Sequence, residues 1–117
     1  MPGMASSQSR IQKRRNTIMA ELIIYIDANF GGLHTHLFES TSDFTQLALG
    51  GVGSGINGNW NDRTSSFVII SGHWTFFKDI NFSFQQGGIL GPGLYSFVQN
   101  FGIDNDALSS VRLVSST

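Results

Sequence analysis

Short hydrophobic runs recur from residue 20 onward, separated by clusters of glycine, asparagine and serine. No segment places apolar residues at i, i+3, i+4 and i+7, so an amphipathic helix is not indicated. Runs that mix β-branched and aromatic residues between turn residues predict β-strands, and their regular spacing favours an all-β sandwich. Trp74 and the phenylalanines are the natural core candidates. The predicted strands are LIIYIDANF, LHTHLFES, SFVIISG, HWTFFKDINFSF, LYSFVQNF and SVRLVSS.

Two sequence marks recur in the same order, which indicates an internal duplication. An aromatic residue, four further residues and a second aromatic open each unit, as YIDANFGG from Tyr25 and FKDINFSF from Phe77. A polar hexapeptide then precedes the last strand of each unit, as NDRTSS at 61–66 and NDALSS at 105–110. We therefore predict two tandem Greek keys, about 22–71 and 73–114, that form a β-sandwich of two four-stranded antiparallel sheets.

Charge divides the chain into a basic N-terminal segment and an acidic body. Residues 1–19 carry four basic and no acidic side chains, whereas 20–117 carry three basic and eight acidic ones. The segment 1–19 lacks the apolar centre of a secretory signal, and we interpret it as a disordered tail rather than a nucleic-acid-binding arm. No apolar run approaches the roughly 18 residues that span a bilayer. These features lean towards the cytoplasm, with non-classical secretion left open.

Few other residue patterns suggest chemistry. The chain has no cysteine, so disulfides and thiolate metal sites are excluded. GSGING at 53–58 matches a dinucleotide fingerprint, but no helix is predicted after it, so we expect a flexible loop. His34 and His36 share one face of a strand; they are a possible Zn²⁺ or Cu²⁺ pair, but no third ligand is recognisable, and an exposed strand face is the simpler interpretation. No catalytic triad or nucleophile elbow is present, and we expect no enzyme.

The two repeated marks resemble those of the βγ-crystallin family, in particular its microbial calcium-binding members with one domain of two Greek keys. That family carries an aromatic hairpin and a clamp written [ND][ND]xx[ST]S in each Greek key. The stretches SGHWTFF and LGPGLYSF also resemble family usage, with Tyr95 as a corner tyrosine. The resemblance covers about residues 20–114. Two departures stand out: Phe84 occupies a position where the family prefers glycine, and the first unit lacks the LGPGxY element.

The resemblance implies two Ca²⁺ ions shared between the hexapeptides, which we call the first clamp (61–66) and the second clamp (105–110). Ca²⁺ takes roughly six to eight oxygen ligands, and each clamp offers only part of such a shell. The side-chain ligands come from the second and fifth clamp positions, and the sequence leaves open which aspartate pairs with which serine. The implied ligands are the side chains of Asp62, Ser65, Asp106 and Ser109 and the backbone carbonyls of Ile26, Arg63, Lys78 and Ala107.

The ligand chemistry sets expectations for affinity. With about one carboxylate for each ion, we expect binding of about 10⁻⁶–10⁻⁴ M. Arg63 adds a positive charge beside its own carbonyl, so the site that contains it should be the weaker one. Mg²⁺ should bind poorly, because it demands a compact octahedron and loses water reluctantly.

Two functions of different classes remain. The first is a monomeric calcium-binding domain whose ions stabilise the fold. The alternative is a partner-binding module, such as an inhibitor, a toxin or a structural or adhesive protein, in which calcium is incidental. Comparing captured partners with calcium and with chelator would separate the two.

Overall fold

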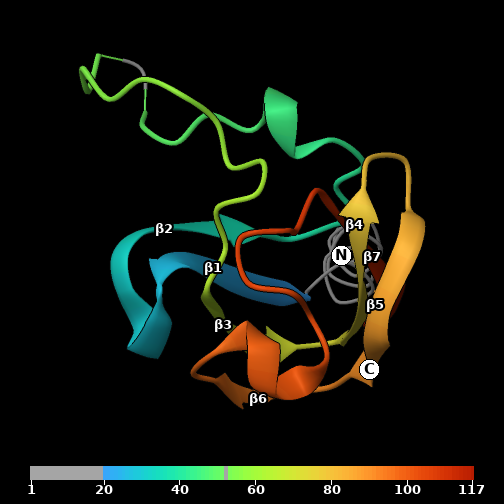
Figure 1. Ribbon diagram of the computed structural model, residues 1–117. Helices are drawn as coiled ribbons and strands as arrows, with labels where there is room; N and C mark the ends of the chain where they lie inside the picture. Colours follow the sequence, from blue (N-terminus) through green and yellow to red (C-terminus); the bar gives the residue numbers. More distant parts are fainter. Residues whose placement is uncertain (1–19, 52) are drawn as a thin grey trace, which may run out of the picture.

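The structure is a computed structural model that describes residues 20–51 and 53–117; the predicted basic tail lies outside them. Within these described residues, seven strands and three short 3₁₀ helices follow one another (Figure 1). Among the described residues, no helix is long and apolar enough to cross a membrane. The elements are β1 (Glu21–Asp27), η1 (Ala28–Phe30), β2 (Gly31–Leu37), η2 (Phe44–Gln46), β3 (Ser66–Ser71), β4 (His73–Asp79), β5 (Ser83–Leu90), β6 (Gly93–Tyr95), η3 (Val98–Phe101) and β7 (Ser110–Ser115).

The strands form two antiparallel sheets, as the sequence predicts. One sheet has the order β2-β1-β3-β6 and the other has the order β5-β4-β7. Strand β6 belongs to the second half of the chain, yet it pairs with β3 of the first half. In return, Thr41 of the first half forms an isolated bridge with Val111 of β7. Each half therefore contributes a segment to the sheet of the other half. This exchange is the Greek-key crossing that joins the two halves.

The second sheet has three strands, where we expected four. The segment around Thr41 should supply the fourth, but only its single bridge to Val111 forms. Next to it, the hydroxyl of Ser40 accepts a hydrogen bond of 2.9 Å from the backbone N–H of Leu113. In a regular ladder the N–H of Leu113 would donate to a backbone carbonyl of the neighbouring strand. Here it donates to the Ser40 side chain instead, and the strand pairing ends.

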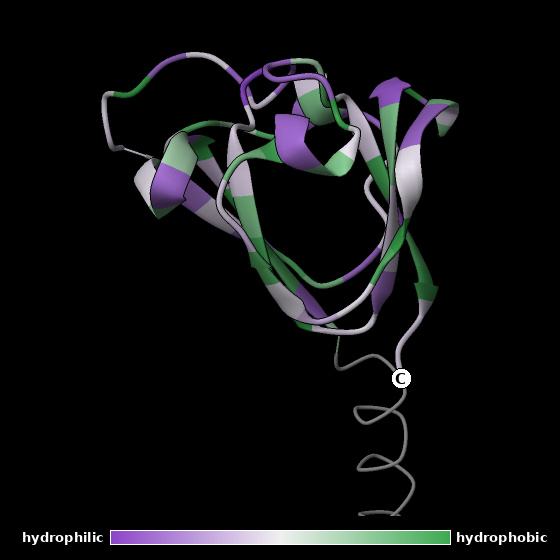
Figure 2. Cartoon of the chain, turned by 60° about the horizontal axis from the view of Figure 1, so that its bottom comes forward, coloured by the Kyte–Doolittle hydropathy of each residue, from purple (hydrophilic) through white to green (hydrophobic). Residues whose placement is uncertain are grey.

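The core lies between the two sheets, where hydrophobic positions of both face each other (Figure 2). Phe67 of β3 and Phe76 of β4 stack across this layer with ring centroids 4.6 Å apart. Trp74 is fully buried, as predicted. The expectation that the phenylalanines fill the core is wrong for three of them, Phe38, Phe84 and Phe101, which are exposed. Phe38 follows the end of β2, and Phe84 lies in β5 with a φ of 66°, so the backbone of the hairpin rather than burial places its ring.

The two predicted aromatic hairpins fold in the same way. Tyr25 and Phe30 meet edge to face with ring centroids 5.7 Å apart, and Phe77 and Phe82 repeat this contact at 5.7 Å. Each second aromatic has a positive φ, 61° at Phe30 and 57° at Phe82. The shared geometry confirms that the aromatic marks are two copies of one folded hairpin.

Tyr95 forms the predicted tyrosine corner. Its hydroxyl donates a 2.7 Å hydrogen bond to the carbonyl of Gly91, four residues earlier in the LGPGLY stretch. Its ring stacks on Phe67, with centroids 4.8 Å apart. The corner therefore ties the short strand β6 both to the turn before it and to the core.

Candidate metal centre

Each clamp leads directly into the last strand of its half, so that the final serine of the clamp is the first residue of β3 or β7. The second residue of each clamp, Asp62 or Asp106, has a φ of 59°. Aspartate tolerates this left-handed conformation better than most residues. The equal φ gives both aspartates the same left-handed conformation at the same position of the two loops.

The clamps are joined to each other by their backbones. The N–H of Asp62 donates to the carbonyl of Leu108 at 3.0 Å, and the N–H of Asp106 donates to the carbonyl of Thr64 at 3.4 Å. Leu108 and Thr64 occupy the same position in their clamps. The two loops are therefore paired reciprocally, as expected for two copies related by a pseudo-two-fold axis.

Side chains repeat this crossing. The hydroxyl of Ser65 donates to Asp106 Oδ1 at 3.2 Å, and the hydroxyl of Ser109 donates to Asp62 Oδ1 at 3.3 Å. The sequence left the pairing of aspartates with serines open, and the structure pairs each aspartate with the serine of the other clamp. Each pair joins residues more than forty positions apart, so neither pair can form within one half alone.

The backbone of each clamp also touches the aromatic hairpin of its own half. The N–H of Ser65 donates to the carbonyl of Tyr25, and the N–H of Ser109 donates to the carbonyl of Phe77, both at 3.0 Å. Ile26 and Lys78, whose carbonyls the sequence assigns to the ions, are the next residues in these hairpins. The fifth clamp position is thus held beside the expected carbonyl.

The last serine of each clamp fixes the hairpin. The hydroxyl of Ser66 donates to the carbonyl of Asp27 at 2.6 Å and accepts from the N–H of Phe30 at 3.0 Å. Ser110 makes the matching bonds to Asp79 and Phe82 at 2.7 and 3.1 Å. Both serines are fully buried. The sixth clamp residue therefore has a structural role and is not available as a ligand.

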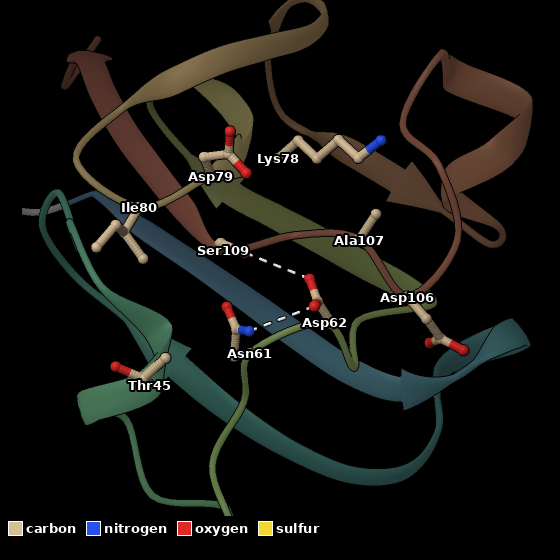
Figure 3. A pocket seen from close by; sticks show the side chains of 9 residues that line it. All are labelled: Thr45, Asn61, Asp62, Lys78, Asp79, Ile80, Asp106, Ala107 and Ser109. Atoms are coloured by element: carbon tan, nitrogen blue, oxygen red, sulfur yellow. Dashed lines mark hydrogen bonds between the residues drawn. The ribbon is translucent and has the colours of Figure 1, made fainter.

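A cleft of about 560 Å³ opens beside the crossed clamps (Figure 3). Asp62 lies between Asn61 and Ser109, while the carboxylate of Asp106 points away from them towards the other side. Five of the eight sequence-predicted ligand residues line this cleft, and Ile26, Arg63 and Ser65 do not. The lining residues are Thr45, Asn61, Asp62, Lys78, Asp79, Ile80, Asp106, Ala107 and Ser109.

The oxygen positions suit calcium. Two oxygens that bind one Ca²⁺ at about 2.4 Å and about a right angle lie about 3.4 Å from each other. The two Asp–Ser oxygen pairs, at 3.2 and 3.3 Å, have this spacing. In addition, Asn61 Oδ1 is buried at the cleft without a hydrogen-bond partner, although buried amide oxygens are nearly always satisfied. The donor set therefore fits a hard cation.

The donor set also excludes a carboxylate-rich or histidine-rich centre at the clamps. Within residues 20–51 and 53–117, no three histidine, cysteine, aspartate or glutamate side chains gather closely enough to hold a metal ion together. Any ion at the clamps would depend on backbone carbonyls, hydroxyls and water as well as one carboxylate. This is the composition expected from the sequence.

Gln86 is a site residue that the sequence analysis missed. Its side-chain Nε2 donates to the carbonyl of Ala107 at 3.3 Å, and its Oε1 accepts from the N–H of Asp104 at 2.9 Å. The side chain is buried and braces the second clamp from behind. In the first half the equivalent position is Thr35, which lies opposite Ile24 as Gln86 lies opposite Phe76, and a threonine side chain is too short to span the same gap. No sequence signal marks Gln86, because its role depends on a loop that lies about twenty residues away.

Comparison with known proteins agrees with this architecture. The sequence model of the Beta/Gamma crystallin family matches residues 21–114. A beta/gamma-crystallin of Ciona intestinalis is 34% identical over 94 residues, which cover 80% of this chain and 98% of that protein. A solved archaeal βγ-crystallin is 33% identical with a TM-score of 0.65, covering 82% of this chain and 99% of the other. A transition-metal-ion-binding βγ-crystallin from Methanosaeta thermophila is 29% identical with a TM-score of 0.60, covering 80% and 99%.

The family match spans both halves of the sandwich, from β1 to β7. It therefore includes both aromatic hairpins, both clamps and the exchange of segments between the sheets. The sequence resemblance, the fold and the relatives lead to one conclusion: this chain belongs to the βγ-crystallin family.

Proposed function

We propose that the domain binds two Ca²⁺ ions between its clamps and that the ions stabilise the fold. The observation that carries this proposal is the crossed pairing of Asp62 with Ser109 and of Asp106 with Ser65. Each pair holds a carboxylate and a hydroxyl at the spacing of two ligands on one calcium ion. A bound ion would replace the hydroxyl proton as the link between the two oxygens.

The contacts divide the expected ligands into two sets. In the first set, the side chains of Asp62 and Ser109 lie in the cleft with Lys78 and Ala107, which would each give a backbone carbonyl. From the pseudo-two-fold relation we expect the second set to be the side chains of Asp106 and Ser65 and the carbonyls of Ile26 and Arg63. Water would complete both shells, as is usual for calcium.

The two proposed calcium sites differ in how firmly their backbone carbonyls are held and in the charge beside them. The carbonyl of Ala107 is held by Gln86 and still has a second lone pair for an ion. The carbonyl of Arg63 belongs to an exposed residue with a cationic side chain. A rigid and less positively charged site binds Ca²⁺ more tightly, so we expect the Ala107 site to be the stronger.

Calcium would contribute to stability by binding the folded state alone. At a hundredfold excess over the dissociation constant this contribution is about 2.7 kcal/mol. The chain has no cysteine, so no disulfide can give a comparable stabilisation. The binding of a metal ion by the relative from Methanosaeta thermophila supports a metal-dependent role for this fold. The βγ-crystallin fold is generally structural rather than enzymatic, and we expect no catalytic activity.

Calorimetric titration of the full chain with CaCl₂ tests the proposal. We expect two binding events of about 10⁻⁶–10⁻⁴ M and a higher melting temperature in calcium than in chelator. The double variant Asp62→Asn/Asp106→Asn keeps the shape of both side chains and should lose both effects. The matched control Glu39→Gln/Asp104→Asn removes two exposed carboxylates outside the ligand sets and should keep them. An unchanged melting temperature in calcium, together with no binding heat, would refute the proposal.

A further inference from the structure

His34 and His36 lie side by side on the outer face of β2, away from the clamps. Their ring centroids are 5.3 Å apart and the ring planes meet at 70°. Both residues are exposed. The two imidazoles therefore form a pair that solvent can reach from one side.

The spacing of the rings is that of two imidazoles on one ion. A metal–nitrogen distance of about 2.1 Å places each ring centroid about 3.2 Å from the ion, so two rings at tetrahedral positions have centroids about 5.3 Å apart. The observed centroid distance of 5.3 Å equals this value. The distance between the two rings is therefore compatible with both imidazoles binding one ion.

Glu21 adds a carboxylate beside the histidine pair, which the sequence analysis did not identify. Glu21 belongs to the neighbouring strand β1, and its Oε2 lies 2.6 Å from Nδ1 of His36. A carboxylate that accepts the N–H of a histidine fixes its tautomer and leaves the other ring nitrogen as a metal ligand, and such a carboxylate is one of the usual partners of a metal-binding histidine. Glu21 therefore orients His36 with Nε2 free.

Aromatic neighbours hold both rings in place. His34 lies against Tyr25 with centroids 5.5 Å apart, and His36 stacks on Phe38 with an interplanar angle of 12°. The four rings form one row along the sheet, so neither imidazole is free to rotate without breaking a contact. Ligands whose side chains are already fixed lose less conformational entropy when an ion binds.

We infer that His34 and His36 bind a divalent transition-metal ion, with Glu21 as the carboxylate that orients His36. Two imidazoles and water make up the shell, since the described residues offer no third histidine or carboxylate facing the ion. Imidazole nitrogen favours Cu²⁺ and Zn²⁺ over Ca²⁺ and Mg²⁺, and Cu²⁺ binds more tightly than Zn²⁺ in the general order of divalent metals. This site is independent of the calcium proposed at the clamps.

Titration of the full chain with CuCl₂ and with ZnCl₂, both in excess CaCl₂, tests the inference. Calcium keeps the clamps filled, so they do not compete for the added metal. We expect one ion of each metal, with Cu²⁺ tighter, and a copper electron paramagnetic resonance spectrum with splitting from two nitrogens. Acidification should release both ions, because imidazole must be neutral to bind.

Single variants locate the site. His34→Ala and His36→Ala should each weaken Cu²⁺ binding at least tenfold and reduce the splitting to one nitrogen. Glu21→Gln should weaken it about 10- to 100-fold while both nitrogens remain, and Glu21→Asp should restore part of the loss. The matched control is His73→Ala, because His73 lies on the other sheet and bonds the carbonyl of Thr117. It should bind Cu²⁺ like the wild type.

The same experiments can overturn the inference. Wild-type Cu²⁺ affinity in His34→Ala and His36→Ala would show that the pair is only an exposed strand face. Loss of Cu²⁺ binding in Asp62→Asn/Asp106→Asn, with the histidine variants unchanged, would assign the metal to the clamps. Both histidines are exposed, so their replacement should leave the fold intact. Circular dichroism of each variant checks this.

Discussion

At the scale of single residues, Phe84 has a backbone conformation that glycine has at the matching position of the other hairpin. Its φ is 66°, and that of Gly32 is 73°. A Cβ at Gly32 would lie 2.6 Å from Asp27 Oδ2, so glycine is required there. Phe84 is 73% exposed, and its side chain gains little from burial to offset the left-handed conformation. The departure from the family pattern is therefore a source of strain.

Replacing Phe84 with glycine should relieve that strain. A left-handed conformation costs a non-glycine residue about 1–2 kcal/mol, part of which the added freedom of glycine in the unfolded chain cancels. We expect Phe84→Gly to raise the free energy of unfolding by about 1 kcal/mol in urea titrations. Gly32→Ala, the reverse change in the other hairpin, should lower it. A less stable Phe84→Gly protein would mean that the exposed ring makes a compensating contact.

Tyr95 links the stability of the domain to alkaline pH. Burial raises the pKa of its hydroxyl above the ordinary value of 10.0. In the unfolded chain this hydroxyl loses its proton first, so the unfolded state binds fewer protons and the free energy of unfolding falls as pH rises through about 10. Tyr95→Phe should flatten this alkaline decline and, by removing the bond to Gly91, cost about 1 kcal/mol at neutral pH. Urea unfolding from about pH 8 to about pH 11 measures both effects, and an equally steep decline in the variant would assign it to other groups.

At the scale of elements, the two hairpins are held folded by serines from distant strands. Ser110 at the start of β7 bonds both sides of the turn between β4 and β5, and Ser66 does the same for β1 and β2. The repeated hexapeptide is therefore more than a ligand loop. Its second and fifth residues face the other clamp, and its last residue closes the hairpin of its own half.

Removing that last hydroxyl should open the hairpin. Ser110→Ala leaves the carbonyl of Asp79 and the N–H of Phe82 without a partner, which should cost about 1–3 kcal/mol in the free energy of unfolding. Amide hydrogen exchange should rise at the turn before it rises in the core. Ser83→Ala is the matched control, because Ser83 is exposed at the same turn. Equal stability of the two variants would contradict this role.

At the scale of the whole molecule, each half of the chain contributes residues to the other half in two regions, the sheets and the clamps. The sheets exchange β6 and the residue Thr41, and the clamps exchange aspartate–serine contacts. Neither half contains a complete sheet or, in the proposed arrangement, all the ligands of one ion. This is the physical reason that a duplicated sequence forms one domain rather than two.

Because of this exchange, we predict that a substitution in one clamp lowers the calcium affinity of both proposed sites. In the proposed arrangement the carboxylate of Asp62 would bind one ion, and its backbone N–H donates to the carbonyl of Leu108 in the other clamp. We expect Asp62→Ala to abolish the Ala107 site and to weaken the Arg63 site as well, with Asp106→Ala doing the converse. Calorimetry of the two single variants measures this, and a variant that loses one site while the other keeps wild-type affinity would rule out the coupling.

Most strand positions, the duplication and the clamps were predictable from sequence, because they rest on local patterns. The predicted strand LYSFVQNF was wrong beyond Tyr95, where the chain forms the 3₁₀ helix η3, and the predicted strand HWTFFKDINFSF is divided between β4 and β5. Alternating apolar residues predict strands wherever one face is buried, and the repeat of YIDANF and FKDINF predicts two equivalent hairpins. The buried Trp74 follows from the same patterns, whereas the corner at Tyr95 was implied by the resemblance to the βγ-crystallin family. The exposed Phe84 could not be predicted, because its left-handed backbone is set by the hairpin rather than by its own preference.

The sequence by itself determined which residue types each half presents: two aromatic hairpins, two polar clamps and enough apolar strand surface for one core. Tertiary structure alone decided how those parts meet. It paired Asp62 with Ser109 and Asp106 with Ser65, placed Gln86 behind Ala107, and brought Glu21 to His36. These contacts join residues between 15 and 47 positions apart. Local preferences carry no information about such distances, which are fixed only when the two sheets close on one core.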